Sequence, residues 1–259
     1  MSNILSQNEK KNLISLIVEL GVETENIKKE ISNFSLKDDN SPVTKADFLV
    51  NKELNRFCKK TSTLNIISEE NAKVSFKHRS QWEYYWHIDP IDGTKEFITK
   101  GEDYTINIAL CKKNRPIFSL VYAPSRKELF YAEKGQGAFK NNQRILINKS
   151  TKKRKLNLVA SKSHINQETS LFIESLSKIY DVRTVQFGSS LKICKVAEGA
   201  ADLYPRFGPT MEWDTCAADL VINEAGGYMQ DLKKNRLEYN KQNLLNPFFI
   251  VSAIKNFEL

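Results

Sequence analysis

The sequence contains little histidine and cysteine and no long apolar run. Of its 259 residues, three are histidine and four are cysteine, and neither a CxxC pair nor an HExxH motif occurs. A zinc site therefore has little support from the sequence. No apolar run approaches the ~18 residues that a membrane-spanning helix requires. Three of the cysteines lie within apolar stretches, so we expect reduced and mostly buried thiols, as in a cytoplasmic protein.

The overall composition is typical of a globular protein. Hydrophobic residues make up 41% of the chain and charged residues 27%. The net charge of +8 suits an anionic partner, although a solvated basic surface explains it equally well. The basic run at residues 152–155 has no interleaved aromatic residues. We therefore interpret it as a solvated connector and expect no nucleic-acid partner.

The apolar pattern changes along the chain. Residues 4–33 carry the stripe of an amphipathic helix, with a candidate break at Gly21, and show no secretory cleavage pattern. After a polar loop at 34–45, we predict a helix at 46–60 and strands at 64–67, 84–88, 104–111, 116–123 and 129–133. The second half alternates strands at 156–160, 182–186, 201–204 and 248–252 with helices at 168–178, 189–198 and 215–225. This pattern predicts an α+β domain at residues 1–150 and an α/β domain at residues 151–259.

Acidic side chains stand at the ends of several predicted elements. They are Asp47, Glu69, Glu70, Asp89, Asp92 and Asp214. Magnesium prefers oxygen ligands in near-octahedral geometry, and a pair of such ions needs carboxylates from different segments with little nitrogen or sulfur nearby. Without a cation the same carboxylates would repel one another. The set therefore indicates a magnesium centre if the fold brings these segments together.

The segment DPIDGT at residues 89–94 concentrates this chemistry. Asp89 closes a predicted strand, and the proline after it cannot continue the ladder, so Asp92 can reach the same small volume. The Ile91 carbonyl is expected to be unpaired in this turn and to serve as a further ligand. Gly93 allows a close approach of the backbone to a ligand, and Thr94 begins a predicted helix whose free amides favour an anion such as phosphate.

Each acidic motif has a simpler interpretation when it stands alone. Ser68-Glu69-Glu70 is typical of a solvated cap, Asp92-Gly93 of a hairpin turn, and Trp213-Asp214 of a helix start with Asp214 as the N-cap. The order of the three motifs and the spacing within residues 89–94 favour a metal centre instead.

The order of these motifs resembles that of the lithium-sensitive, magnesium-dependent phosphatases of the inositol monophosphatase superfamily. The shared marks are Glu69-Glu70, then DPIDGT at 89–94, then Trp213-Asp214 at the start of a helix. Further segments are similar to the bacterial CysQ branch, the 3'(2'),5'-bisphosphate nucleotidases: DNSPVTKAD at 39–47, DGTKEFI at 92–98, GSSLK at 188–192, AEG at 197–199 and LYPRFGPT at 203–210. One departure is Ala218, which stands where that family usually has glycine. The resemblance covers nearly the whole chain and implies a layered αβαβα sandwich of the inositol monophosphatase and sugar phosphatase type.

The resemblance also implies roles for individual residues. The first magnesium ion would be held by Glu69, Asp89 and the Ile91 carbonyl, and the second by Asp89, Asp92 and Asp214. Asp47 and Thr94 would position or activate the attacking water, with Glu69 orienting it or holding a third ion. The substrate contacts would be Asp92, the amides of Gly93 and Thr94, His164, Ser189, Lys192, Arg206 and Asp214.

The residues themselves support the phosphate contacts less strongly. Arg206 could bind a second phosphate in bidentate fashion, and Lys192 would add a point charge. Taken without the resemblance, the residues favour an exposed helix lysine at Lys192, and a lone loop histidine such as His164 is usually a surface residue. The nucleotide assignment therefore depends on the family pattern.

By resemblance, the expected reaction is hydrolysis of adenosine 3',5'-bisphosphate to AMP and phosphate, with the phosphosulfate analogue as a further candidate substrate. This places the enzyme in sulfur assimilation, with two or three Mg²⁺ ions and inhibition by Li⁺. An inositol monophosphatase or another sugar-phosphate phosphatase is the alternative. A non-catalytic nucleotide- or RNA-binding protein is disfavoured, because convergent carboxylates repel an anionic ligand. A cytoplasmic protein is expected; the monomer, the homodimer and peripheral attachment to the inner membrane all stay open.

Overall fold

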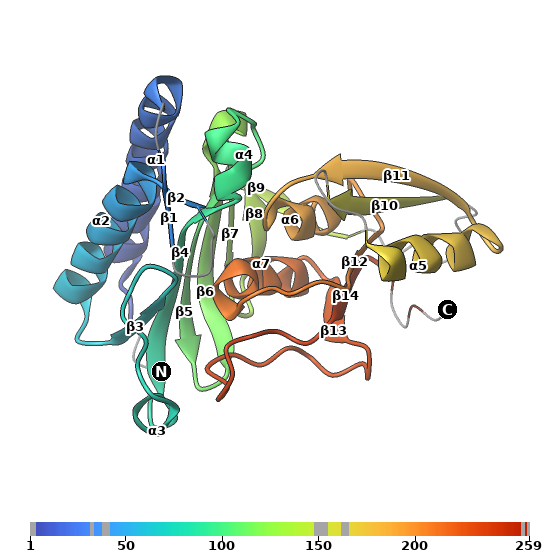
Figure 1. Ribbon diagram of the computed structural model, residues 1–259. Helices are drawn as coiled ribbons and strands as arrows, with labels where there is room; N and C mark the ends of the chain where they lie inside the picture. The colour runs from blue at the N-terminus through green and yellow to red at the C-terminus, as the bar shows by residue number, and fades with distance from the viewer. Residues whose placement is uncertain are drawn as a thin grey trace.

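The protein is a stack of five layers, two of them β-sheets and three of them helical (Figure 1). The computed structural model describes residues 4–31, 34–37, 42–147, 155–161, 166–254 and 257. The first layer holds α1 (Gln7–Glu30) and α2 (Lys45–Thr61), which pack on a seven-stranded sheet. Helices α6 (Leu191–Ala197) and α7 (Glu212–Glu224) separate that sheet from a five-stranded one, and α5 (Gln167–Ser177) covers the outer face. The αβαβα sandwich predicted from the family resemblance is confirmed.

The seven-stranded sheet has the order β3-β4-β5-β6-β7-β8-β9. Its strands are β3 (Asn65–Ser68), β4 (Tyr84–Asp92), β5 (Thr105–Lys112), β6 (Arg115–Ala123), β7 (Glu128–Glu133), β8 (Gly137–Lys140) and β9 (Gln143–Ile145). Only the β3–β4 pair is parallel among its pairings. Consecutive strands from β4 onward are neighbours, so this sheet is a meander whose parallel edge strand brings Ser68 beside Ile88. That pairing sets Glu69 next to the end of β4.

The five-stranded sheet has the order β11-β10-β12-β14-β13. Its strands are β10 (Lys155–Ser161), β11 (Asp181–Phe187), β12 (Leu203–Arg206), β13 (Tyr228–Asp231) and β14 (Phe249–Ser252). Strand β10 runs parallel to β11 and β12, whereas β14 is antiparallel to β12 and β13. The helix-connected parallel part confirms the strand–helix alternation predicted for this half of the sequence.

Helix α1 is continuous through the position where the sequence suggested a break. It begins with a capping box in which Ser6 and Glu9 exchange hydrogen bonds. Gly21 lies in its interior because the helix packs closely on β6 there: a Cβ atom on Gly21 would stand 2.3 Å from Tyr122 Cε1. The glycine therefore serves close packing, and of the two alternatives for residues 4–33, one helix or two, the single helix is confirmed.

Several short elements were not predicted from the sequence. Within the expected loop at 34–45, β1 (Ser35–Leu36) pairs with β2 (Pro42–Val43). Helix α3 (Phe76–Arg79), the 3-10 turn η1 (Pro124–Arg126) and strands β8, β9 and β13 also went unpredicted. Each spans two to four residues, too few for an apolar period to be recognised.

The largest apolar core lies between the two sheets. It joins residues before position 150, such as Tyr85 and Val121, to residues after it, such as Leu191 and Val221. The division of the chain near residue 150 stays a prediction, and it falls within 148–154, outside the described residues. Among the described helices, none is long and apolar enough to cross a membrane.

Candidate active site

A β-bulge at the end of β4 brings two of the predicted acidic residues to one face of the sheet. Asp89 pairs with Asn107 and Asp92 with Thr105, so β4 has one more residue than β5 between these pairs. Because Asn107 and Thr105 are two apart on β5, they share a face, and the extra residue places Asp89 and Asp92 on a common face as well. Pro90 lies within the bulge, where its missing amide hydrogen is tolerated. The strand continues past it to Asp92, so the expectation that the strand closes at Asp89 is wrong.

The turn after β4 is held by Gly93 and Thr94. Gly93 has φ of +87°, and a Cβ atom there would lie 3.2 Å from the Asp103 carbonyl oxygen. Thr94 begins α4 (Thr94–Ile98), as predicted, and its hydroxyl donates to the Ile91 carbonyl at 3.0 Å. The expectation that this carbonyl is unpaired is therefore wrong, although a carbonyl oxygen has a second lone pair for a further interaction.

The remaining acidic residues reach the same region from other elements. Asp214 is the third residue of α7, and its Oδ2 accepts the Met211 amide at 2.8 Å, so it caps the helix from inside. Asp47 does the same on α2, where its Oδ2 accepts the amide and the hydroxyl of Thr44, each at 2.7 Å. Glu69 follows β3, and its amide donates to the Ile88 carbonyl at 3.3 Å. Helix capping thus fixes two carboxylates, and sheet pairing fixes the third.

These carboxylates lie close enough for the charge of one to raise the pKa of another. Asp89 is 1% exposed, and its Oδ1 has no hydrogen-bond partner among the described residues. Burial raises the pKa of Asp89 well above its ordinary value, and the negative charges of Glu69, Asp92, Asp214 and Asp47 raise it further. Burial and the charge of Asp92 likewise raise the pKa of Asp214. A buried group of mutually repelling carboxylates with an unpartnered oxygen fits one or more hard divalent cations.

The pKa values of Asp92 and Asp47 result from opposing effects of burial, hydrogen bonds and nearby charges. Burial raises the pKa of Asp92 to about 6, although the charge of Lys192 and a hydrogen bond from the Ser190 amide oppose the rise. Burial raises the pKa of Asp47 to about 7 against its two hydrogen bonds from Thr44. A carboxylate with a pKa near neutrality is suited to accept a proton at the pH of a cell.

Lys37, which the sequence did not single out, contacts the acidic group from the β1–β2 hairpin. Its ammonium pairs with Glu69 at 2.6 Å and also with Glu70. Burial alone would lower the pKa of Lys37, but the hydrogen bonds to the two glutamates raise it above its ordinary value. Lys37 lies in a polar segment with no motif, so no sequence pattern indicated this contact.

A cavity of about 430 Å³ adjoins the acidic group, with Asp92 and Asp214 in its lining. Lys192 and Arg206 line it as well. The Lys192 side chain is 7% exposed, and its Nζ lies 5.6 Å from the centre of the Tyr204 ring. Burial lowers the pKa of Lys192 to about 8, although the charge of Asp92 opposes the change. The predicted phosphate-binding cations therefore lie beside the carboxylates, and Lys192 is a buried residue rather than an exposed helix lysine.

Arg206 retains hydrogen-bonding capacity toward this cavity. Its Nη2 donates to the Pro209 carbonyl at 2.7 Å, which orients the guanidinium. Its Nε is buried and has no hydrogen-bond partner among the described residues. A guanidinium carries five N–H donors, so several stay available for a ligand.

Ser189 and Ser190, which follow Gly188, form another part of the cavity wall. The Gly188 amide donates to Asp103 Oδ2 at 3.1 Å, and Ser189 adopts a positive φ of 49°. Ser190 was not predicted to take part, yet its hydroxyl contacts Asn107 Oδ1 at 2.7 Å and Thr105 Oγ1 at 2.8 Å beneath the bulge. His164, the other predicted contact, lies outside the described residues.

The comparisons with known proteins agree with this arrangement. The profile of the inositol monophosphatase family matches residues 8–251. The chain is 37% identical over 222 residues to the 3'(2'),5'-bisphosphate nucleotidase CysQ of Salmonella typhimurium, which covers 85% of this chain and 88% of that protein. It is 35% identical to the crystal structure of CysQ from Bacteroides thetaiotaomicron, with a TM-score of 0.84 over 97% of this chain and 99% of that one. It also shares the fold of an IMPase/NADP phosphatase complexed with Mg²⁺ and phosphate, with 22% identity and a TM-score of 0.80 over 95% and 91% of the two chains.

The family profile extends over nearly the whole chain, the two CysQ relatives above are 37% and 35% identical to it, and Asp92 and Asp214, from two of the family's acidic motifs, line a single cavity. The chain therefore belongs to the inositol monophosphatase family.

Proposed function

We propose that the protein is a magnesium-dependent 3'(2'),5'-bisphosphate nucleotidase that hydrolyses the 3'-phosphate of adenosine 3',5'-bisphosphate, giving AMP and phosphate. The observation that carries this proposal is the position of two cations, the buried Lys192 and the half-buried Arg206, in a cavity that is also lined by Asp92 and Asp214. A substrate with two phosphates needs cations at both ends: metal ions at the reacting phosphate and protein cations at the other. CysQ from Salmonella, at 37% identity, bears the same activity in its name.

The carboxylates supply the ligand set that two hard cations require. In the proposed assignment, Glu69, Asp89 and the Ile91 carbonyl hold one Mg²⁺, and Asp89, Asp92 and Asp214 hold the second. The unpartnered Oδ1 of Asp89 and the raised pKa of Asp214 support this assignment, because a cation would relieve both. When bound, the ions supply Lewis-acid polarisation and charge neutralisation at the reacting phosphate. A third ion at Glu69 belongs to the same proposal.

The protein groups act mainly by positioning. Asp47 Oδ2 is already occupied by Thr44, so its other oxygen remains to accept a hydrogen bond, and then a proton, from the attacking water. The Thr94 hydroxyl orients the same water, and Glu69 helps to fix it. The amides of Gly93 and Thr94 contact the phosphoryl oxygens, and the burial of Asp47 and Asp89 strengthens the interactions that these two carboxylates make.

The second phosphate and the nucleoside are bound across the cavity. Arg206 provides a fork of donors and Lys192 a point charge for the 5'-phosphate. Ser189 and His164 are the further proposed contacts. Activity on the phosphosulfate analogue, a place in sulfur assimilation and a cytoplasmic location belong to the same proposal, with the oligomeric state left open between monomer and homodimer.

A phosphate-release assay over a small substrate panel tests the proposal. Purified protein is incubated with adenosine 3',5'-bisphosphate, its phosphosulfate analogue and inositol 1-phosphate, each with Mg²⁺, without Mg²⁺, and with added Li⁺. We expect release from the bisphosphate nucleotide that requires Mg²⁺ and is inhibited by Li⁺. Faster release from inositol 1-phosphate would support the alternative sugar-phosphate phosphatase, and nucleotide binding without any release would contradict an enzyme.

A further inference from the structure

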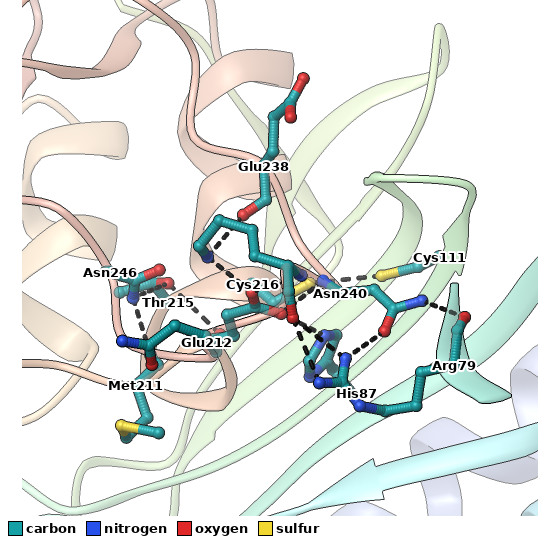
Figure 2. A network of polar contacts seen from close by, with 12 residues as sticks. Arg79, His87, Cys111, Met211, Glu212, Thr215, Cys216, Glu238, Asn240 and Asn246 are labelled. Atoms are coloured by element: carbon teal, nitrogen blue, oxygen red, sulfur yellow. Dashed lines mark hydrogen bonds and ion pairs between the residues drawn. The ribbon is translucent and has the colours of Figure 1, made fainter. Parts of the chain in front are cut away.

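A second cluster of potential metal ligands lies behind the acidic group. His87 of β4, Cys111 of β5 and Cys216 of α7 each offer one donor atom, and these atoms all lie within 4.8 Å of one another. The two thiol sulfurs are 3.3 Å apart. Figure 2 shows the three side chains between the sheet and the helix, with Glu212 beside them. The ligands come from three elements that are distant in sequence, which is why no motif indicated them.

The backbone geometry explains how this cluster forms. In the β4–β5 register His87 pairs with Ala109, and the small side chain of Ala109 leaves space on that face of the sheet. Cys111 lies two residues further on the same face as Ala109. On α7, Cys216 follows Glu212 by four residues, so both lie on the helix face that packs against the sheet.

The cluster is fully buried, and one of its donor atoms has no partner among the described residues. His87 is 1% exposed and both cysteines are 0% exposed. The two thiols are hydrogen-bonded to each other, and His87 Nε2 lies 3.2 Å from the Glu212 carboxylate. Among the described residues, His87 Nδ1 has no hydrogen-bond partner, and the neighbouring Tyr85 hydroxyl has none either. A buried ring nitrogen is usually hydrogen-bonded or bound to a metal, so Nδ1 points to a missing ligand.

Glu212 is placed to orient the imidazole. Its Oε2 lies 3.2 Å from His87 Nε2, and it is fully buried. Its carboxylate also accepts hydrogen bonds from the backbone amides of Asn240 and Lys241, so its position is fixed (Figure 2). A carboxylate that holds one nitrogen of a histidine while the other binds metal is a recurrent arrangement in zinc proteins.

We propose that His87, Cys111 and Cys216 bind one divalent ion of the zinc class, with Glu212 fixing the imidazole. Thiolate and imidazole ligands bind zinc in preference to magnesium. The acidic group offers only oxygen ligands, which favour magnesium. Each thiol gives up its proton on binding, so the ion replaces two protons and forms a neutral unit with two thiolates. This neutrality suits a buried position.

A bound ion would stabilise the backbone segments that carry the proposed magnesium ligands. His87 precedes Asp89 by two residues on β4, and Cys216 follows Asp214 by two residues on α7. An ion at this site would link β5 to the positions on β4 and α7 that lie two residues from the proposed magnesium ligands Asp89 and Asp214. It takes no part in the hydrolysis, so its presence and the proposed function are tested separately.

Cobalt substitution and metal analysis test the site. Protein is purified from zinc-supplemented medium and its zinc content measured; metal-free protein is then titrated with Co²⁺ in the presence of excess Mg²⁺, which occupies the carboxylates. We expect one tightly held zinc per chain and, with Co²⁺, thiolate-to-metal charge-transfer absorption. Both are lost in Cys111→Ala and Cys216→Ala, whereas Cys58→Ala, which removes a buried thiol of α2, retains both.

Glu212→Gln provides a graded test, with an expected ~10–100-fold loss of zinc affinity. The Co²⁺ absorption spectrum of the unmodified protein tests the proposed site even if a variant fails to fold, because the charge-transfer absorption requires a cysteine ligand. Absence of charge-transfer absorption in that protein overturns the proposal, as does a disulfide between Cys111 and Cys216 found by mass spectrometry of the freshly purified chain. Magnesium-dependent phosphate release in a zinc-free sample would leave the proposed function intact.

Discussion

The backbone amide of Ser190 donates a hydrogen bond to the Asp92 carboxylate and thereby joins the bulged end of β4 to the segment that begins α6. The same carboxylate is the charge that opposes the lowered pKa of Lys192. Asp92 thus stands between the acidic group and the cation-lined cavity. In the proposed function, Asp92 would therefore link the metal ions at the reacting phosphate to the cations that bind the second phosphate.

Asp89→Asn is expected to abolish most activity while the fold is retained. Asp89 is the proposed ligand shared by both ions, and its loss removes part of a charge stabilisation worth several kcal/mol. Turnover should fall by ~100-fold or more, since 1.4 kcal/mol corresponds to a factor of ten. Steady-state kinetics with saturating Mg²⁺ measure the effect. Asp181→Asn, at an exposed position of β11, is the control, and near-normal turnover in Asp89→Asn would remove Asp89 from the site.

The metal-free protein is expected to lose stability as pH rises, and Mg²⁺ to restore it. The pKa of Asp92 is raised from 3.8 to about 6 and that of Asp47 to about 7. A carboxyl whose pKa is higher in the folded state contributes stability below its unfolded pKa, and this contribution is lost as pH rises through the folded pKa. In chelator, the melting temperature should fall between about pH 4, near the unfolded pKa, and about pH 7, the folded pKa of Asp47. Added Mg²⁺ should raise it most at the upper end, because the ion binds the ionised site of the folded state alone.

Thermal unfolding followed by circular dichroism over this pH range, with and without Mg²⁺, checks the expectation. The Asp89→Asn variant should show a smaller response to Mg²⁺ than the unmodified protein. A melting temperature that rises with pH in chelator would contradict the raised pKa values of the acidic group.

Arg206→Ala is expected to weaken binding of the bisphosphate nucleotide far more than binding of inositol 1-phosphate. A hydrogen bond to a charged group contributes ~1.5–3 kcal/mol, so KM for the nucleotide should rise by roughly 10- to 100-fold. Arg183→Ala, at an exposed position of β11, is the matched control and should leave both KM values unchanged. Equal effects of Arg206→Ala on the two substrates would argue against a role at the second phosphate.

The sequence alone was sufficient to predict the structural features that depend on the spacing of residues within one segment. Strand β4, the turn at Gly93 and helix α4 follow from the order of apolar residues, proline, glycine and threonine within a single segment. The alternation of strands and helices after residue 150 was also predicted, because its longer elements, such as β10, α5 and β11, span enough residues to show a period. The joint placement of Glu69, Asp89 and Asp214 followed only from the family resemblance, since no local pattern encodes contacts between distant segments.

The features that were missed arise from tertiary packing. The bulge between Asp89 and Asp92 depends on the register with β5, which the residues of β4 alone do not determine. Lys37, which follows β1, reaches Glu69 where β1 pairs with β2, and a polar loop sequence does not reveal that pairing. The approach of His87, Cys111 and Cys216 likewise requires the position of α7 on the sheet.

Gly21→Ala is expected to destabilise the protein even though alanine favours helices. The new Cβ atom would lie 2.3 Å from Tyr122 Cε1 and 3.2 Å from Pro124 Cβ, so the buried Tyr122 ring or the whole of α1 must shift. Overpacking typically costs ~1–3 kcal/mol, which outweighs a propensity gain of at most ~1 kcal/mol. Urea unfolding should therefore show a lower free energy of unfolding. Val22→Ala, at the exposed neighbouring position, should change it little, and an unfolding free energy for Gly21→Ala equal to or above that of the unmodified protein would show that α1 does not pack on β6 at this distance.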